Sequence, residues 1–257
     1  MNGTGLTIAL TVAVLVGGVF GFYPELDLKL AALFFDPEAK RFTNYFYPWL
    51  GPIREAAMWI VAAFAAPAVF ALVFKLIKPR RPLLVSGRAI LFLLTTLALG
   101  PGLVVNMGLK EHWGRSRPID VPQLAGPERF TPWWDPSGIC PKNCSFVSGD
   151  ASGAYWLLAP AALAPPQWRA AAYAGAVAFG AGVGLLRMAF GGHFFTDTVF
   201  AGIFVFLIIW LVHGLIYRWP RTRLSDEAID SALKRWVLRS WAFWAGAFGR
   251  RPKSSEN

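Results

Sequence analysis

The chain has 257 residues, of which 55% are hydrophobic and only 16% are charged, and its formal net charge is +10. This composition excludes an ordinary soluble domain, in which about a quarter of the residues are charged. No aromatic–basic surface of the kind that binds nucleic acid accompanies the charge, so we expect no nucleic-acid partner.

Long apolar blocks follow one another along the chain. A block of about 18 or more apolar residues is typical of a transmembrane helix. The blocks predict an all-α fold, a polytopic membrane helix bundle with six transmembrane helices in one domain, residues 1–217. They are Leu6–Tyr23, Ala56–Ile77, Ala89–Leu109, Val147–Ala164, Ala170–Met188 and Phe194–Tyr217.

Two of these blocks carry unusual features. No Lys or Arg precedes Lys29, so the first block lacks the basic region of a signal peptide, and we expect it to be retained as a span. The fourth block is short and contains Asp150 and Pro160.

The distribution of basic residues predicts the orientation. Six spans place both ends of the chain on one side, where the connecting segments carry 15 Lys and Arg residues against 10 on the other side. Because basic residues mark the cytoplasmic side, we expect both termini in the cytoplasm and the opposite helix ends at the periplasmic face of a bacterial inner membrane. The run "KLIKPRRPLLVSGR" (Lys75–Arg88) is the clearest cytoplasmic marker.

The tail, residues 218–257, is predicted to be a basic amphipathic cytoplasmic segment. An apolar stripe at helical spacing runs through Ser225–Phe248, with basic residues off the stripe. Such a helix either lies on an anionic membrane surface or packs under the bundle, and the sequence leaves both open. The stripe is Ile229, Leu233, Trp236, Ser240, Trp244 and Phe248, and the basic residues are Lys234, Arg235 and Arg239.

The chain has two cysteines, in the loop "GICPKNCSF". A disulfide between Cys140 and Cys144 would fit an oxidising compartment, and two free thiols are the alternative. Two thiols without a nearby His make a poor zinc site, so we expect no metal.

Polar residues gather at one set of predicted helix ends. The third and fifth spans end with them, and the fourth and sixth spans begin with them. The predicted topology puts these four ends on the same side, which indicates a single site. The set is Lys110, Arg117, Ser148, Gly149, Asp150, Arg187, His193 and Asp197.

These residue types suit phosphoryl transfer. Guanidinium and ammonium groups bind phosphate oxygens, and helix N-termini add free N–H groups. Gly149 would let the backbone approach the anion closely. His193 and Asp197 are four residues apart, so they share one helical face, and a carboxylate beside a His can fix the tautomer of a nucleophilic imidazole. The pattern indicates a reaction through a phosphohistidine.

Three motifs resemble those of the type 2 phosphatidic acid phosphatase (PAP2) family of integral-membrane lipid phosphatases. The first motif is Lys, six residues and Arg-Pro, and "KEHWGRSRP" (Lys110–Pro118) matches it in full. The second is Pro-Ser-Gly-His, and "VSGD" (Val147–Asp150) matches at Ser-Gly, with Asp150 in place of the His. The third is Ser-Arg, five residues, His, three residues and Asp. "LRMAFGGHFFTD" (Leu186–Asp197) matches it except that Leu186 replaces the Ser.

The resemblance implies a role for each residue. Lys110, Arg117 and Arg187 would bind the phosphate, helped by Ser148 and the Gly149 backbone. His193 would be the nucleophile and Asp197 its partner. The family's second-motif His donates a proton to the leaving group, a role that would fall to Asp150 here. The family uses no metal or other cofactor.

We therefore expect a membrane lipid-phosphate phosphatase that acts at the periplasmic face, with a phosphorylated lipid and the bilayer as its partners and no obligate protein partner. Lipid A, undecaprenyl pyrophosphate and phospholipid phosphates are candidate substrates. The loop 119–146, with Arg129, Trp133 and Trp134, could contact a large head group and favours lipid A. Two alternatives stay open: a lipid phosphotransferase, and a non-catalytic lipid-binding or transport protein, for which Asp150 is the hint.

Overall fold

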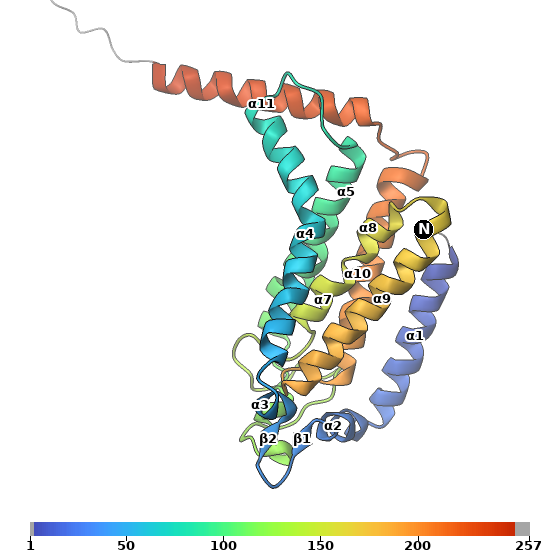
Figure 1. Ribbon diagram of the computed structural model, residues 1–257, viewed down its shortest axis with the longest axis vertical. Helices are drawn as coiled ribbons and strands as arrows, with labels where there is room; N and C mark the ends of the chain where they lie inside the picture. The colour runs from blue at the N-terminus through green and yellow to red at the C-terminus, as the bar shows by residue number, and fades with distance from the viewer. Residues whose placement is uncertain (1–2, 250–257) are drawn as a thin grey trace, which may run out of the picture.

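The computed structural model describes residues 3–249, with side chains as far as Trp244. Long helices run side by side along its long axis, which confirms the all-α bundle (Figure 1). They are α1 (Gly3–Phe22), α4 (Leu50–Ile77), α5 (Gly87–Leu97) with its continuations η1 (Ala98–Leu109) and α6 (Lys110–His112), α9 (Pro166–Ala189), and α10 (Phe195–His213) with its continuation η4 (Gly214–Arg218).

Five helices in the described part of the chain are long and apolar enough to cross a membrane. The range 147–164, predicted as a further span, instead forms two short helices, α7 (Gly149–Tyr155) and α8 (Leu158–Ala162). Pro160 lies in this range and cannot donate the backbone hydrogen bond of a continuous helix. Trp156 at the break is fully buried, and its Nε1 donates to Thr96 Oγ1 at 3.0 Å. The sixth span therefore stays a prediction.

Side-chain caps fix where three of the helices begin. Ser86 Oγ accepts a hydrogen bond from the backbone N–H of Ala89 at the start of α5, and Ser148 Oγ accepts one from Ala151 at the start of α7. The Asp197 carboxylate accepts from the Phe194 N–H at the start of α10, at 2.7 Å. Because such caps satisfy N–H groups that lack partners inside the helix, they hold two helix starts at the predicted site.

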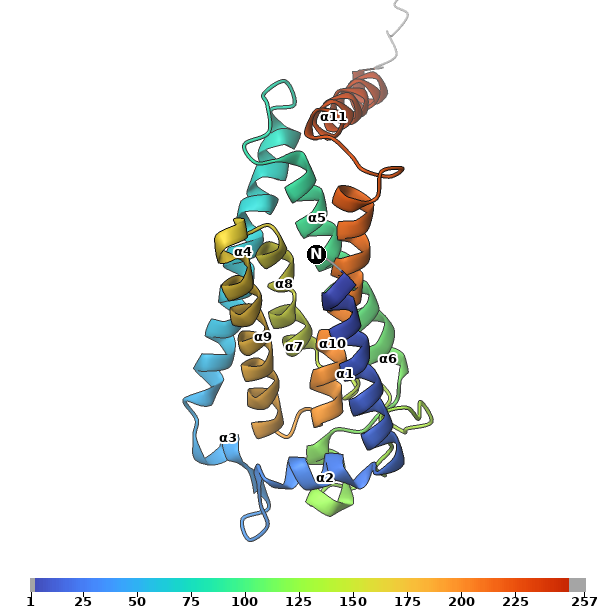
Figure 2. The ribbon, with the colours of Figure 1, turned by 90° about the vertical axis from the view of Figure 1, so that its right-hand side faces the viewer.

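Short elements close one end of the bundle (Figure 2). Helix α2 (Glu25–Ala32) lies across this end, followed by the strands β1 (Phe35–Asp36) and β2 (Arg41–Phe42), which pair antiparallel, and by α3 (Thr43–Phe46). The single turns η2 (Pro118–Asp120) and η3 (Pro122–Leu124) lie in the loop after α6. A small apolar cluster holds the elements together, made of Ala31, Phe42, Val121, Leu124 and Phe194.

Helix α11 (Asp226–Gly249) crosses the opposite end, toward which α1 begins (Figure 1). Its first half is attached to the bundle by two ion pairs, Asp226 to Arg88 at 3.1 Å and Asp230 to Lys75 at 2.7 Å. Its second half extends past α4.

The face that α11 turns to the bundle differs by one position from the predicted stripe. Val237 is 2% exposed, whereas Trp236, which the stripe includes, is 62% exposed. The side chain of Phe248 lies outside the described residues.

Candidate active site

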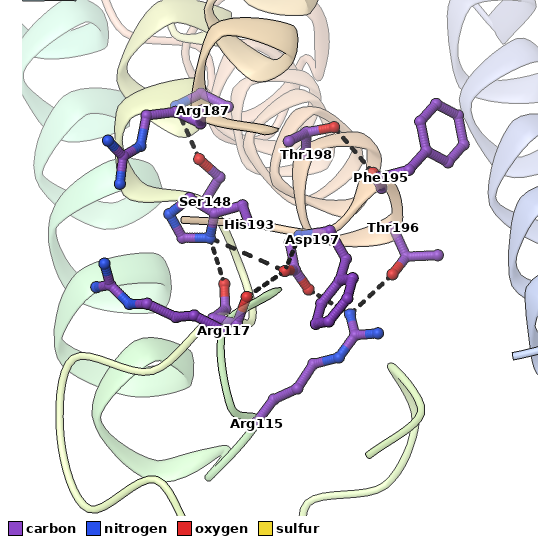
Figure 3. Close-up of polar contacts among 12 residues, drawn as sticks. Arg115, Arg117, Ser148, Arg187, His193, Phe195, Thr196, Asp197 and Thr198 are labelled. Carbon is purple, nitrogen blue, oxygen red and sulfur yellow. Dashed lines mark hydrogen bonds and ion pairs between the residues drawn. The ribbon is translucent and has the colours of Figure 1, made fainter. Parts of the chain in front are cut away.

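The predicted site residues meet at the end of the bundle that α2 closes. Figure 3 shows several of them around the start of α10. The third and fifth helix paths end here, and α7 and α10 begin here, so four separate segments supply the side chains. The residues brought together are Lys110, Arg117, Ser148, Gly149, Asp150, Arg187, His193 and Asp197.

His193 is buried and held in one orientation. It precedes α10 and is 1% exposed. Its Nδ1 lies 2.7 Å from the backbone carbonyl oxygen of Ser145 and 3.9 Å from Asp197 Oδ2. Since a carbonyl oxygen only accepts hydrogen bonds, Nδ1 must carry the proton. The lone pair is therefore on Nε2, which is the arrangement a nucleophilic imidazole needs.

The surrounding charges keep His193 neutral. Burial, followed by the positive charges of Arg187, Arg117 and Lys110, holds its pKa well below the ordinary value of 6.5. The ring is therefore unprotonated on Nε2 near pH 7. A bound phosphate would offset these charges and favour the cationic form that arises when Nε2 bonds to phosphorus.

Asp197 makes contacts on both carboxylate oxygens. Oδ2 accepts hydrogen bonds from the Ser145 hydroxyl and the Phe194 N–H, and Oδ1 accepts one from Arg115 Nη1. Asp197 is fully buried, so these bonds stabilise its charge where water cannot. One residue, Ser145, thus contacts both members of the His–Asp pair.

Gly149 and Gly192 allow cationic side chains to lie close to the main chain. A Cβ on Gly149 would lie 2.7 Å from Asn106 Oδ1 and 3.4 Å from Lys110 Nζ, so Lys110 lies close to the N-terminus of α7. A Cβ on Gly192 would clash with Arg187 Nη2. In both places a side chain would displace a cationic group or its neighbour.

Arg117 is held by the loop that follows α6. Its Nη2 and Nε donate to the carbonyl oxygen of Asn143, at 2.7 and 3.2 Å. Asn143 has a φ of 55° and lies between Cys140 and Cys144, which the structure joins by a disulfide with Cα atoms 5.7 Å apart. The closed loop thus presents one carbonyl that orients a site cation.

Asp150 pairs with two arginines. Its Oδ2 lies 2.6 Å from Arg54 Nε and 3.3 Å from Arg187 Nε. Asp150 is in the first turn of α7, outside the five candidate spans. Burial raises its pKa, but the hydrogen bond from Arg54 and the charges of Arg187, Arg54 and Lys110 outweigh burial, so the net shift is downward. Without substrate, Asp150 is a carboxylate.

Sequence reasoning missed Arg54. It is the fifth residue of α4, before the block predicted to span the membrane, and no motif marks it. The available signal was an arginine next to an apolar span, because such residues cluster at functional sites as well as at membrane boundaries.

No group of three or more His, Cys, Asp or Glu side chains in the described part of the chain could hold a metal ion. The cations and helix N-termini instead form an anion-binding site with a neutral imidazole beside it, and this arrangement can transfer a phosphoryl group.

Comparisons with known proteins agree with this chemistry. Residues 89–223 match the PAP2 superfamily. A protein of Francisella tularensis subsp. novicida named "Lipid A 4'-phosphatase" is 42% identical over 207 residues, which cover 77% of this chain and 90% of that protein. Proteins of the same name from Rhizobium leguminosarum and Rhizobium etli are 42% and 38% identical, over 41% of this chain and 46% and 41% of their own lengths. No solved structure matches the chain.

Proposed function

Because the chain belongs to the PAP2 superfamily, a membership that its match and relatives establish, we propose that it is a lipid A phosphatase that works through a phosphohistidine. The observation that carries the mechanism is the hydrogen bond from His193 Nδ1 to the Ser145 carbonyl, which leaves Nε2 free beside three cations.

In the first proposed step, Nε2 of His193 attacks the phosphorus atom of a lipid phosphomonoester. A P–N bond forms, the P–O bond to the lipid breaks, and the lipid oxygen takes up a proton. Lys110, Arg117 and Arg187 neutralise the charge of the transferring group, and the Ser148 hydroxyl and the N-terminus of α7 contribute further donors. In the second step, water attacks the phosphohistidine, breaks the P–N bond and releases inorganic phosphate.

We propose Asp150 as the source of the leaving group's proton. Its pairs with Arg54 and Arg187 make it a carboxylate in the resting site. A substrate dianion competes for the same guanidinium groups and adds negative charge next to the carboxylate. Both effects favour protonation of Asp150 when substrate is bound, which is when an acid is needed.

The substrate proposal rests on the relatives and on the loop 119–146. All three relatives are named "Lipid A 4'-phosphatase". In this chain Trp134 is 53% exposed, and the side chain of Arg129 is 69% exposed. These groups are available to a large sugar head group at the end of the bundle that carries the site.

For localisation we propose a multi-pass protein of a bacterial inner membrane, with the site at the periplasmic face and both termini in the cytoplasm. The basic-residue count supports it, and α1 begins toward the end where α11 lies. A reporter enzyme that is active only in the periplasm, fused after Asn257, should be inactive. An active fusion would reverse the orientation.

We also propose that α11 rests on the cytoplasmic membrane surface. Trp241 and Trp244 follow the buried Val237 by four and seven residues, so they continue the face that packs on the bundle. This part of α11 extends past α4, and both Trp side chains are at least half exposed. Exposed Lys234, Arg235 and Arg239 suit anionic head groups.

Phosphate release by the purified protein tests the function. The substrates are lipid A carrying phosphates at positions 1 and 4', undecaprenyl pyrophosphate and phosphatidic acid, with mass spectrometry of each lipid product. We expect loss of the 4'-phosphate of lipid A. Preference for another lipid would correct the substrate, transfer to a second lipid would make the protein a phosphotransferase, and no turnover on any of the lipids would contradict the enzyme proposal.

A further inference from the structure

Arg115 has a different role from its neighbour Arg117. It is fully buried, and its guanidinium carbon lies 4.4 Å from the ring centroid of Phe194. Its Nε donates to the carbonyl oxygen of Thr131, and Nη1 donates to Thr196 Oγ1 and to Asp197 Oδ1. Arg115 therefore contacts the back of the His–Asp pair and does not face the anion site.

The remaining arm of Arg115 reaches a second carboxylate. Nη2 donates to Oδ2 of Asp27 at 2.8 Å, and Asp27 is 1% exposed. Asp27 also accepts hydrogen bonds from the backbone N–H and the hydroxyl of Thr196, the residue next to Asp197. Asp27 lies on α2, outside the range 89–223 that matches the superfamily.

The charges of this group matter for the chemistry. Two buried carboxylates, Asp27 and Asp197, flank one guanidinium, so the ionised trio carries one net negative charge. His193 gains a positive charge when Nε2 bonds to phosphorus while Nδ1 keeps its proton. Without the charge of Asp27, the charges of Arg115 and Asp197 would cancel. The group would then carry no net negative charge to stabilise the imidazolium of His193.

We propose that Asp27 is a positioning residue: through Arg115 and Thr196 it fixes Asp197 and keeps the trio net negative, which stabilises the phosphorylated form of His193. The inference rests on the proposed function of the same site. It gives α2, the helix that lies across the end of the bundle, a part in the rate of phosphoryl transfer (Figure 1).

The test compares Asp27→Asn with Glu25→Gln, a change of an exposed carboxylate on the same helix. Asn keeps the size of Asp and one acceptor but removes the charge. Groups that orient a metal ligand are worth about 10- to 100-fold, and we expect a similar fall in kcat for Asp27→Asn, with KM little changed. Glu25→Gln should match the wild type.

A second measurement separates this role from a general loss of folding. Orthovanadate adopts a geometry like that of the transferring phosphoryl group and can bond to an imidazole, whereas inorganic phosphate resembles the ground state. Asp27→Asn should weaken inhibition by vanadate about as much as it lowers kcat and leave inhibition by phosphate unchanged. Equal weakening of both would mean a distorted anion site and would overturn the proposal.

A double-mutant cycle tests the charge argument. Arg115→Gln leaves two unpaired carboxylates and should be worse than Asp27→Asn. The double variant Asp27→Asn/Arg115→Gln restores one net negative charge and should be more active than the product of the single effects predicts. If the activity of the double variant equals the product of the two single effects, Asp27 and Arg115 act independently, and the charge argument is wrong. If wild-type protein hydrolyses no lipid phosphate, the proposed function fails; if it is active and Asp27→Asn equals it, only this inference fails.

Discussion

The carbonyl oxygen of Ser145 is closer to Nδ1 of His193 than the carboxylate of Asp197 is, at 2.7 Å against 3.9 Å. A backbone carbonyl cannot be protonated or removed by substitution, so the tautomer of His193 is fixed by the chain path through Ser145. Asp197 holds Ser145 in place by accepting a hydrogen bond from its hydroxyl.

Replacing His193 by Ala should abolish phosphate release while the protein stays folded in detergent. His112 is exposed at the end of α6, and His213 lies in the last turn of α10, at its far end. Turnover and thermal unfolding, measured on one preparation, check the loss of activity and the retention of the fold. Turnover near the wild-type rate would exclude a phosphohistidine at this position.

Asp197→Asn should reduce both rate and stability. The amide can no longer balance Arg115 and accept from Ser145 and Phe194 at once. Breaking a buried ion pair costs about 3–5 kcal/mol, and loss of a His-orienting carboxylate lowers kcat by up to about 10⁴-fold. Glu38→Gln, at an exposed carboxylate, is the control and should change neither the melting temperature nor kcat. A stable and fully active Asp197→Asn variant would show that the Ser145 carbonyl alone is sufficient to orient His193.

Arg54→Gln should change the pH dependence if Asp150 donates the proton. Removing the Arg54 guanidinium raises the pKa of Asp150, so the protonated acid persists to higher pH. The alkaline limb of kcat, which reports the substrate complex, should then move upward by about one pH unit for a lipid phosphate. An activated aryl phosphate, whose leaving group needs no proton, should show no such shift.

Two further variants complete that test. Arg41→Gln removes an exposed arginine at the same end of the molecule and should leave the profile unchanged. Asp150→Asn should lower activity on lipid phosphates and spare the aryl phosphate. An unmoved limb in Arg54→Gln together with an active Asp150→Asn would assign the proton to another donor.

His193 should make stability fall in mild acid. Its pKa is depressed in the folded protein, so below about pH 6.5 the unfolded chain takes up a proton that the folded site rejects. The melting temperature of the wild type should therefore drop more between pH 7 and pH 5 than that of His193→Gln. Parallel curves would indicate that His193 titrates normally in the folded protein.

The membrane contact of α11 can be probed with single cysteines, since Cys140 and Cys144 are bonded to each other. A polarity-sensitive fluorophore at Trp244→Cys should report a less polar environment in vesicles with anionic lipids than in zwitterionic ones. The same fluorophore at Ala242→Cys, on the opposite face of α11, should report water in both. Identical spectra at the two positions would contradict a helix that lies with one face on the membrane.

The apolar blocks predicted the long helices well because length and hydrophobicity are local properties. Helix α4 was predicted from Ala56 and begins at Leu50, because the polar residues Arg54 and Glu55 interrupt the apolar sequence before Ala56. The range 147–164 was predicted as one helix. There, the break follows from the burial of Trp156 and from Pro160, and burial depends on neighbours that are distant in sequence.

The site was predicted as a set of residues, and the contacts between them were not. Motif spacing placed Lys110, Arg187 and His193 at helix ends, but no spacing connects Arg54 to Asp150, which are 96 residues apart. Asp27 is further removed, 169 residues before Thr196, and only the packing of α2 across the end of the bundle brings its side chain to the site. Long-range ion pairs of this kind leave no local periodicity to detect.

Gly149 and Gly192 bring main chain against the groups that would hold the anion. A mutation at either position cannot change the site gradually, because an added Cβ would clash with Asn106 or with Arg187. The exposed residues of the loop 119–146, such as Trp134, meet no such restriction. Differences in head-group preference among related proteins should therefore map to that loop and not to the two glycines.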